Sequence, residues 1–170
     1  KGEFTIASNA FSKCSNLESV TLPASTIIEE GAFDLNSARN AELKIVPTGN
    51  YTSVESTLGK GATGFKKIVF DEGISSIGPN AFEIEASPVI VSPRPIPLAN
   101  GPTSIVLPST LGFIDAYAFR GCTAIQDITV NNETPLAVDE NAYPFTGFTA
   151  SLNVPTGSKQ NYLYHTYWIS

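Results

Sequence analysis

The sequence of 170 residues has very few of the side chains on which common catalytic chemistry depends. It contains one histidine, His165, and two cysteines, Cys14 and Cys122. Nucleophilic catalysis of the Ser/His or Cys/His kind needs an imidazole beside the nucleophile, and zinc needs clustered His, Cys or carboxylate ligands. No such spacing occurs. We therefore expect no catalytic residues, no metal site and no cofactor, and we expect His165 to be solvated or packed in the C-terminal segment.

Positive charge, long apolar runs and methionine are also scarce or absent. Ten Lys and Arg against 16 Asp and Glu give a formal net charge of -6, and the longest basic cluster is Lys66-Lys67. This excludes the clustered basic surface that nucleic acids and anionic membranes require. No apolar run approaches the ~18 residues of a membrane helix, which predicts no direct membrane insertion. The chain has no methionine, which indicates a processed chain or a fragment.

What the sequence does contain is a repeated phrase. The segment Ile6 to Leu22 returns 108 positions later, as Ile114 to Val130, and matches at its large apolar positions and its cysteine without a gap. Four weaker copies lie between and after these two. The strand-like ends of the six copies are Leu22, Val46, Phe70, Leu107, Val130 and Val154. A period in the twenties is typical of a leucine-rich-repeat solenoid, in which each unit buries its apolar face against its neighbours.

Two patterns occur within a copy. Apolar residues two apart close each copy and predict a short, half-buried strand. The Ala-Phe pair upstream lies in a stretch too short for an ordinary helix, so we predict a single helical or 3-10 turn with its Phe in the core. Asn9, Asn80 and Asn141 precede this Ala, where capping of the turn explains them without a ligand. The core residues that we predict are Ile6, Phe11, Cys14, Phe33, Phe82, Ile114, Phe119 and Cys122.

The two cysteines occupy the same position in the first and fifth copies. Stacked strands are ~4.8 Å apart, so four steps place Cys14 roughly 19 Å from Cys122, whereas a disulfide needs Cα atoms within about 7 Å. We therefore expect two small buried side chains and no disulfide or redox pair.

The remaining copies depart from the phrase. The second is two residues longer before its strand, which leaves open whether Ile45 or Val46 faces inward. The third has Leu58-Gly59 where Ala-Phe belongs, which predicts a thinner and less well packed turn. The sixth begins near Val138 and uses Phe145 as its core aromatic residue.

The fourth copy carries a Pro-rich insertion at about residues 87–102, with five of the twelve prolines of the chain. Proline cannot donate to a sheet ladder, so this density favours an extended, polyproline-like loop that leaves the solenoid. The loop is either a tolerated surface insertion or a presented recognition loop. Its candidate binding residues are Val89, Ile90, Val91, Arg94 and Ile96.

The C-terminal segment 155–170 differs from the repeats. Ser158 is placed to cap a short helix through Trp168, and Tyr162, Tyr164 and Tyr167 gather there with this tryptophan. The aromatic cluster suits either a cap over the open end of a solenoid or carbohydrate stacking, and we favour the cap. No comparable segment precedes the first copy, which suggests a cut into a longer array or the end of a flexible linker.

The phrase Ala-Phe-x-x-Cys-x-x-Leu-x-x-Val-x-Leu-Pro, at residues 10–23, resembles the BspA-like leucine-rich repeats of bacterial surface proteins. The segment Leu152 to Ser158, followed by Tyr162 and Trp168, is similar to the end that this family often carries. The resemblance extends from Ile6 to Trp168. It implies a single repeat domain over residues 1–170, built as a right-handed solenoid of short stacked strands. It also implies a cell-surface or secreted location and adhesion to matrix proteins or other cells, with no shared catalytic residues.

The outward strand positions are the main candidate binding residues. Stacked in register, they form a ladder of mostly β-branched side chains, which suits either recognition or simply a sheet. A flat, weakly charged ladder fits a protein or glycan surface better than a small substrate, which needs a concave pocket. The ladder residues are Thr21, Val69, Val106, Thr129 and Asn153.

Carboxylates offer the one remaining chemistry. Glu29, Glu30, Asp115, Asp139 and Glu140 fall at or near one position of their copies, where they form a solvated acidic edge, a Ca²⁺ site or a glycosidase pair. We take the solvated edge as the default. The favoured hypothesis is a non-catalytic extracellular module that binds a protein or glycan on another cell or matrix. The alternatives are a structural spacer in a larger surface protein and, third, a carbohydrate-acting enzyme.

Overall fold

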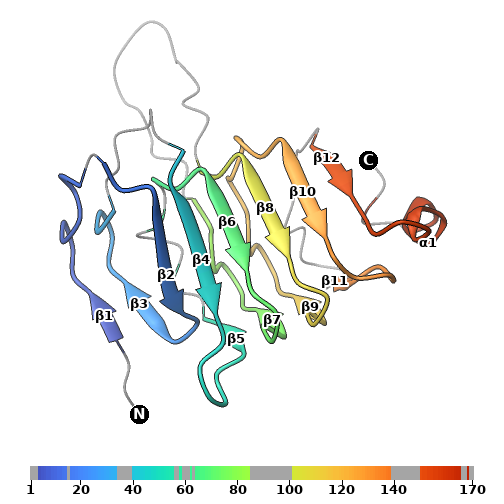
Figure 1. The fold of residues 1–170 in the computed structure, drawn as a ribbon, viewed down its shortest axis with the longest axis horizontal. Coiled ribbons are helices and arrows are strands. Elements are labelled where there is room, and N and C mark those ends of the chain that lie inside the picture. The colour runs from blue at the N-terminus through green and yellow to red at the C-terminus, as the bar shows by residue number, and fades with distance from the viewer. Residues whose placement is uncertain are drawn as a thin grey trace, which may run out of the picture.

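The computed structural model describes residues 4–14, 16–33, 40–55, 58, 62, 64–84, 101–138, 150–165 and 168. They form a solenoid in which successive turns of the chain stack side by side and each contributes strands to two layers (Figure 1). Every pairing between named strands is parallel. The predicted leucine-rich-repeat solenoid of short stacked strands is therefore confirmed.

One layer is a six-stranded sheet, here called the front sheet. Its spatial order is β12-β10-β8-β6-β4-β2, so each repeat adds one strand beside the strand of the previous repeat. The strands end within one residue of the positions predicted from the sequence. Their bounds are β2 (Ser19–Pro23), β4 (Glu42–Val46), β6 (Lys67–Phe70), β8 (Ser104–Leu107), β10 (Asp127–Val130) and β12 (Ser151–Asn153).

The other layer, the back layer, is made of shorter strands from the start of each repeat. A two-stranded sheet pairs β1 with β3, and a four-stranded sheet has the order β11-β9-β7-β5. The bounds are β1 (Phe4–Ile6), β3 (Thr26–Ile28), β5 (Ser53–Val54), β7 (Ser76–Ile77), β9 (Phe113–Ile114) and β11 (Ala137–Val138).

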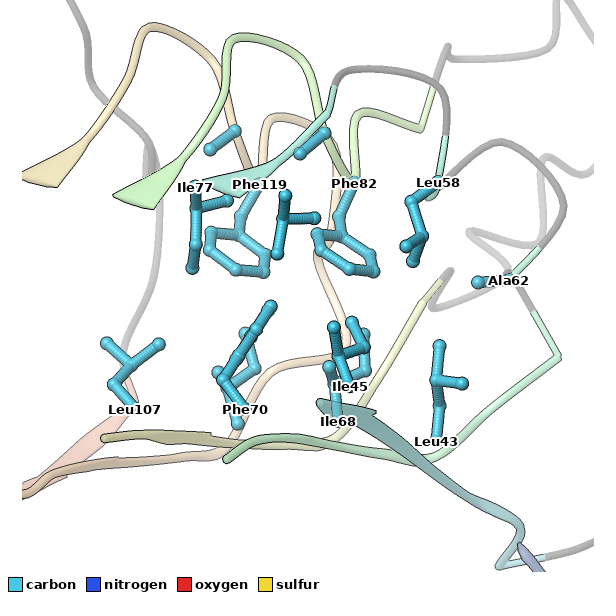
Figure 2. Packing of buried hydrophobic residues seen from close by; sticks show 14 of the residues in the cluster. Leu43, Ile45, Leu58, Ala62, Ile68, Phe70, Ile77, Phe82, Leu107 and Phe119 are labelled. Atoms are coloured by element: carbon cyan, nitrogen blue, oxygen red, sulfur yellow. The ribbon is translucent and has the colours of Figure 1, made fainter. Parts of the chain in front are cut away.

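The core fills the space between the two layers. Phe82 and Phe119 point from the back-layer side toward the front strands, where Phe70 lies among aliphatic side chains (Figure 2). The rings of Phe82 and Phe119 are stacked with centroids 5.3 Å apart, and Phe70 meets Phe82 edge-on at 5.6 Å. In the fourth and fifth copies an aromatic ring thus spaces the layers and packs against the ring of the adjacent turn.

The turn that carries this Phe has a backbone feature that explains its asparagines. The residue directly before the Ala has positive φ in four copies: Asn9 (63°), Gly31 (73°), Asn80 (56°) and Tyr117 (57°). Glycine and asparagine enter this left-handed region most readily, so backbone conformation is a better reason for these asparagines than the capping that we expected. Asn141 lies outside the described residues. Within the turn, bonds from residue i+3 back to residue i, such as Cys14 N–H to the Phe11 carbonyl (3.1 Å), fit the predicted 3-10 geometry.

The irregular copies resolve two open points. Ile45 is fully buried and Val46 is half-buried, so Ile45 faces the core and the outward position beside it is Lys44. In the third copy Leu58 is fully buried, and Phe65 supplies an aromatic ring whose centroid lies 5.0 Å from that of Phe33. The expected loss of packing at this copy is thus offset by Phe65.

Two predicted core residues are not buried. Cys14 is exposed, and Phe11 is 37% exposed although its ring stacks on Phe33 at 4.8 Å. Both belong to the first repeat, against which the described residues pack a neighbouring turn on one side, so the inward position in the phrase does not by itself guarantee burial. The other predicted core residues are buried: Ile6, Phe33, Phe82, Ile114, Phe119 and Cys122.

The C-terminal helix is shorter than predicted. Helix α1 (Lys159–Leu163) ends five residues before Trp168. Ser158 occupies the N-cap position, but its side chain makes no capping hydrogen bond and is buried. The Tyr162 hydroxyl donates to the carbonyls of Asn132 and Thr134 at 2.9 and 3.1 Å, which attaches the helix to the segment after β10.

Candidate interaction surface

The outward face of the front sheet carries an unbroken row of side chains, one from each strand. The register pairs Val69 with Val106 and Val106 with Thr129, and the row continues to both edges of the sheet. We call it the central row: Thr21, Lys44, Val69, Val106, Thr129 and Asn153. The ladder predicted from the sequence is thus assembled in register, with Lys44 as an added member.

The exposure of this row follows from the alternation of side chains along a strand, in which every second residue points away from the core. In β8 the residues Ile105 and Leu107 are fully buried, while Val106 between them is half-buried. The same alternation holds in β6 and β10. Because neighbouring strands in a sheet lie ~4.8 Å apart, the row has a fixed spacing that the backbone holds independently of the side chains.

A second outward row, two residues earlier in each strand, is polar. Its members are Ser19, Glu42, Lys67, Ser104, Asp127 and Ser151. Lys67 forms an ion pair with Glu42 at 2.8 Å, and Lys44 of the central row pairs with Asp71 at 3.0 Å. Charge on this half of the face is therefore locally compensated. The adjoining part of the central row, at Val69, Val106 and Thr129, is uncharged.

The Pro-rich candidates cannot be placed on this surface. Val89, Ile90, Val91, Arg94 and Ile96 lie outside the described residues.

The carboxylates of the expected acidic edge are engaged locally. Glu29 accepts hydrogen bonds from the Ser8 amide and hydroxyl at 2.8 and 3.2 Å, and Asp115 accepts one from the Ala116 amide at 2.6 Å. The described ranges hold no group of three or more His, Cys, Asp or Glu arranged to bind a metal ion. Asp139 and Glu140 fall outside those ranges. Glu29 thus accepts hydrogen bonds from an adjacent repeat and Asp115 from its own turn, whereas Glu30 is exposed.

The cysteines are both free, and their environments differ. Cys122 is fully buried, its thiol donates to the Phe82 carbonyl at 3.1 Å, and burial raises the pKa of Cys122 to about 12. Such a thiol stays protonated at physiological pH and is a poor nucleophile. The side chain therefore serves packing and one hydrogen bond between repeats.

The C-terminal aromatic residues pack against the last described turn of the solenoid. Trp168 meets Tyr162 edge-on with ring centroids 6.0 Å apart, and burial raises the pKa of Tyr162 to about 12. A cavity of about 250 Å³ remains between β12 and α1, lined mainly by Leu152, Val154 and these two rings. This arrangement agrees with a cap over the end of the solenoid.

Comparison with known protein families identifies the repeat family of the chain. A family described as the BspA type leucine rich repeat region matches residues 3–90 and 100–164 in six copies. The chain belongs to this family. A search of curated proteins and a search of solved structures each returned no match. BspA-type repeats generally serve protein interaction, are typically non-catalytic and are associated with bacterial surface proteins. No helix among the described residues of this BspA-type chain is long and apolar enough to cross a membrane.

Sequence reasoning found five of the six members of the central row and missed Lys44. The missing member belongs to the second copy, whose extra residues leave the inward register ambiguous. The spacing of Leu43 and Ile45 is the signal that identifies it, because both are fully buried and enclose Lys44 between them.

Proposed function

We propose that this BspA-type chain is a non-catalytic adhesion module at the cell surface or outside the cell, and that it binds a protein or glycan through the central row of the front sheet. The observation that carries the proposal is the unbroken register from Thr21 to Asn153, with one outward side chain per strand. A rigid row with fixed spacing can bind an extended partner without a large ordering cost.

The chemistry of the row indicates the kind of partner. Val69, Val106 and Thr129 offer an apolar, β-branched strip, and the charges of Lys44 and Lys67 beside it are paired with Asp71 and Glu42. Partner binding to such a strip gains from burial of apolar area and loses little from desolvation of unpaired charge. A relatively flat, weakly charged surface of a protein or polysaccharide meets these conditions.

The front sheet and the back layer offer two matched positions at which the same substitution can be compared. Val106 lies at the centre of the front face and is half-buried, and Ser76 is an outward, half-buried residue of β7 on the opposite face. A lysine at either position adds the same charge and bulk to the edge of the same core. Only Val106→Lys disrupts the central row.

The test is a screen of the intact chain against arrays of matrix proteins and glycans, followed by titration of the best ligand with both variants. The proposal expects binding that Val106→Lys weakens at least tenfold and that Ser76→Lys leaves within twofold. Absence of binding at high micromolar concentration favours a structural spacer and contradicts the proposal. Hydrolysis of a glycan in the same screen contradicts its non-catalytic part.

A further inference from the structure

The cavity between β12 and α1, which lie together at one side of the stack, has a lining of unusual composition (Figure 1). Its volume is about 250 Å³. Leu152 and Val154 line it together with two aromatic rings, those of Tyr162 and Trp168, and Lys159 is the charged residue among the described side chains of the lining. We call this cavity the cap pocket.

The apolar wall of the cap pocket is less well covered than the same positions one turn earlier. Leu152 pairs in register with Ile128, which is 6% exposed, and Val130 beyond it is fully buried. Leu152 and Val154 are only half-buried, so α1 leaves apolar surface of β12 facing the cavity. An apolar cavity of roughly 150 Å³ is enough to bind a benzene ring. The cap pocket therefore has room for an apolar group of at least that size.

The two aromatic residues offer their rings to the cavity and use their polar atoms elsewhere. The Tyr162 hydroxyl donates to the carbonyls of Asn132 and Thr134, and the Trp168 indole N–H donates to the Leu136 carbonyl at 3.5 Å. A neutral sugar in this cavity buries hydroxyl groups that find few partners, which costs free energy. The lining thus favours an apolar body over a polyhydroxylated one.

Lys159 gives the cap pocket its charge. Its side chain is exposed, and the ion pairs among the described residues are formed by other cations, namely Lys44, Lys67 and Arg120. The chain as a whole carries a formal net charge of -6, so its general field repels anions. An anion that binds in this cavity must therefore gain from this one lysine and from apolar contact.

We propose that the cap pocket binds a small carboxylate with a compact apolar body, such as an aromatic ring on a short chain. The apolar body packs against Leu152 and the rings of Tyr162 and Trp168, and the carboxylate meets the Lys159 ammonium. Leu152 and the central-row residue Asn153 point to opposite sides of β12, so this site is separate from the central row. The inference stands apart from the adhesion proposal and holds whether or not the central row binds a partner.

Trp168 is the only tryptophan of the chain, so its fluorescence reports on the cap pocket directly. The probe is phenylpropionate, compared with phenylpropanol and phenylpropylamine, which keep the ring and the chain but carry no charge or a positive charge. Each is titrated into the intact chain while the indole emission is followed. Lys159→Gln removes the lysine charge and Lys159→Arg keeps it. Lys13→Gln is the matched control, because Lys13 is an exposed lysine of the first repeat that forms no ion pair with a described residue.

The proposal expects a saturable shift in emission, with phenylpropionate bound about three- to fivefold more tightly than phenylpropanol and phenylpropylamine bound most weakly, since this is the range of one exposed ion pair. Lys159→Gln should abolish the preference for the carboxylate, whereas Lys159→Arg and Lys13→Gln should retain it. Equal affinities of the parent chain for the three probes, or a preference that survives Lys159→Gln, overturns the proposal. So does the absence of a saturable shift.

Ala150→Phe tests the cavity without changing its charge. Ala150 is half-buried and lines the cap pocket, so a phenyl ring at this position occupies the space of the ligand. We expect all three probes to bind at least tenfold more weakly to a variant whose circular dichroism matches that of the parent chain. Unchanged affinities in such a variant overturn the assignment of the site to this cavity. If Ala150→Phe does not fold, the Lys159 comparison decides alone.

Discussion

Replacing Phe119 with alanine tests the core that holds the stack together. Phe119 is fully buried, stacks on Phe82 at 5.3 Å and meets Phe70 edge-on at 6.4 Å. The side chain is fully enclosed, with the Phe82 and Phe70 rings packed against it, so its neighbours cannot readily collapse into the space. Truncation of a buried Phe to Ala costs about 3–5 kcal/mol, which includes the cavity left behind.

Phe11→Ala is the matched control at the equivalent position of the first repeat. Phe11 is 37% exposed and has Phe33 as its stacking partner, so less apolar area is lost and the space opens to solvent. We expect a cost of about 1–2 kcal/mol, from partial loss of the burial term without a closed cavity.

Urea unfolding followed by circular dichroism measures both costs, with the slope checked for each variant because repeat proteins can unfold in steps. For a chain of this size the Phe119→Ala cost corresponds to a fall in Tm of roughly 6–20 °C. A Phe119→Ala cost below about 1 kcal/mol, or equal costs for the two variants, refutes the assignment of Phe119 to an internal core position.

Three further predictions follow from individual contacts. A thiol reagent at pH 8 should modify Cys14 quickly and Cys122 only after unfolding, because burial raises the pKa of Cys122 to about 12; two fast thiols in the native protein contradict this. Gly121→Ala should destabilise the chain by about 1–3 kcal/mol, because φ is +77° and a Cβ overlaps the Ile84 carbonyl; an unchanged urea midpoint contradicts this. Hydrogen bonds from the Ser109 amide and hydroxyl lower the pKa of Glu72. The stability that Glu72 contributes is therefore present above its unfolded pKa and is lost as pH falls through its folded pKa. Glu72→Gln should weaken the dependence of unfolding on acid pH, and a pH profile identical to that of the parent chain contradicts this.

The sequence predicted the strand positions well because each strand is defined locally, by apolar residues two apart before a turn. It did not predict which inward positions are exposed at the end of the stack. Cys14 and Cys122 have the same local sequence pattern, yet one is exposed and the other is buried, since burial depends on a neighbouring turn. The same limit applies to Phe65, whose contact with Phe33 comes from an adjacent repeat.

The candidate surface was predicted in the copies with a regular period and missed where the period changes. Val69, Val106 and Thr129 follow directly from alternation, whereas Lys44 required the register of a longer copy. The positive φ before the Ala was also hidden, because Asn suits both a cap and the left-handed region, and Tyr117 is an unusual residue at such a position.

The most direct test of the proposed function is the ratio of two dissociation constants for the best ligand found by the array screen. One belongs to Val106→Lys on the front face, and the other to Ser76→Lys on the back layer. Binding through the central row predicts that the Val106→Lys constant is at least ten times that of Ser76→Lys, which itself stays within twofold of the parent chain. Equal constants for the two variants contradict the account.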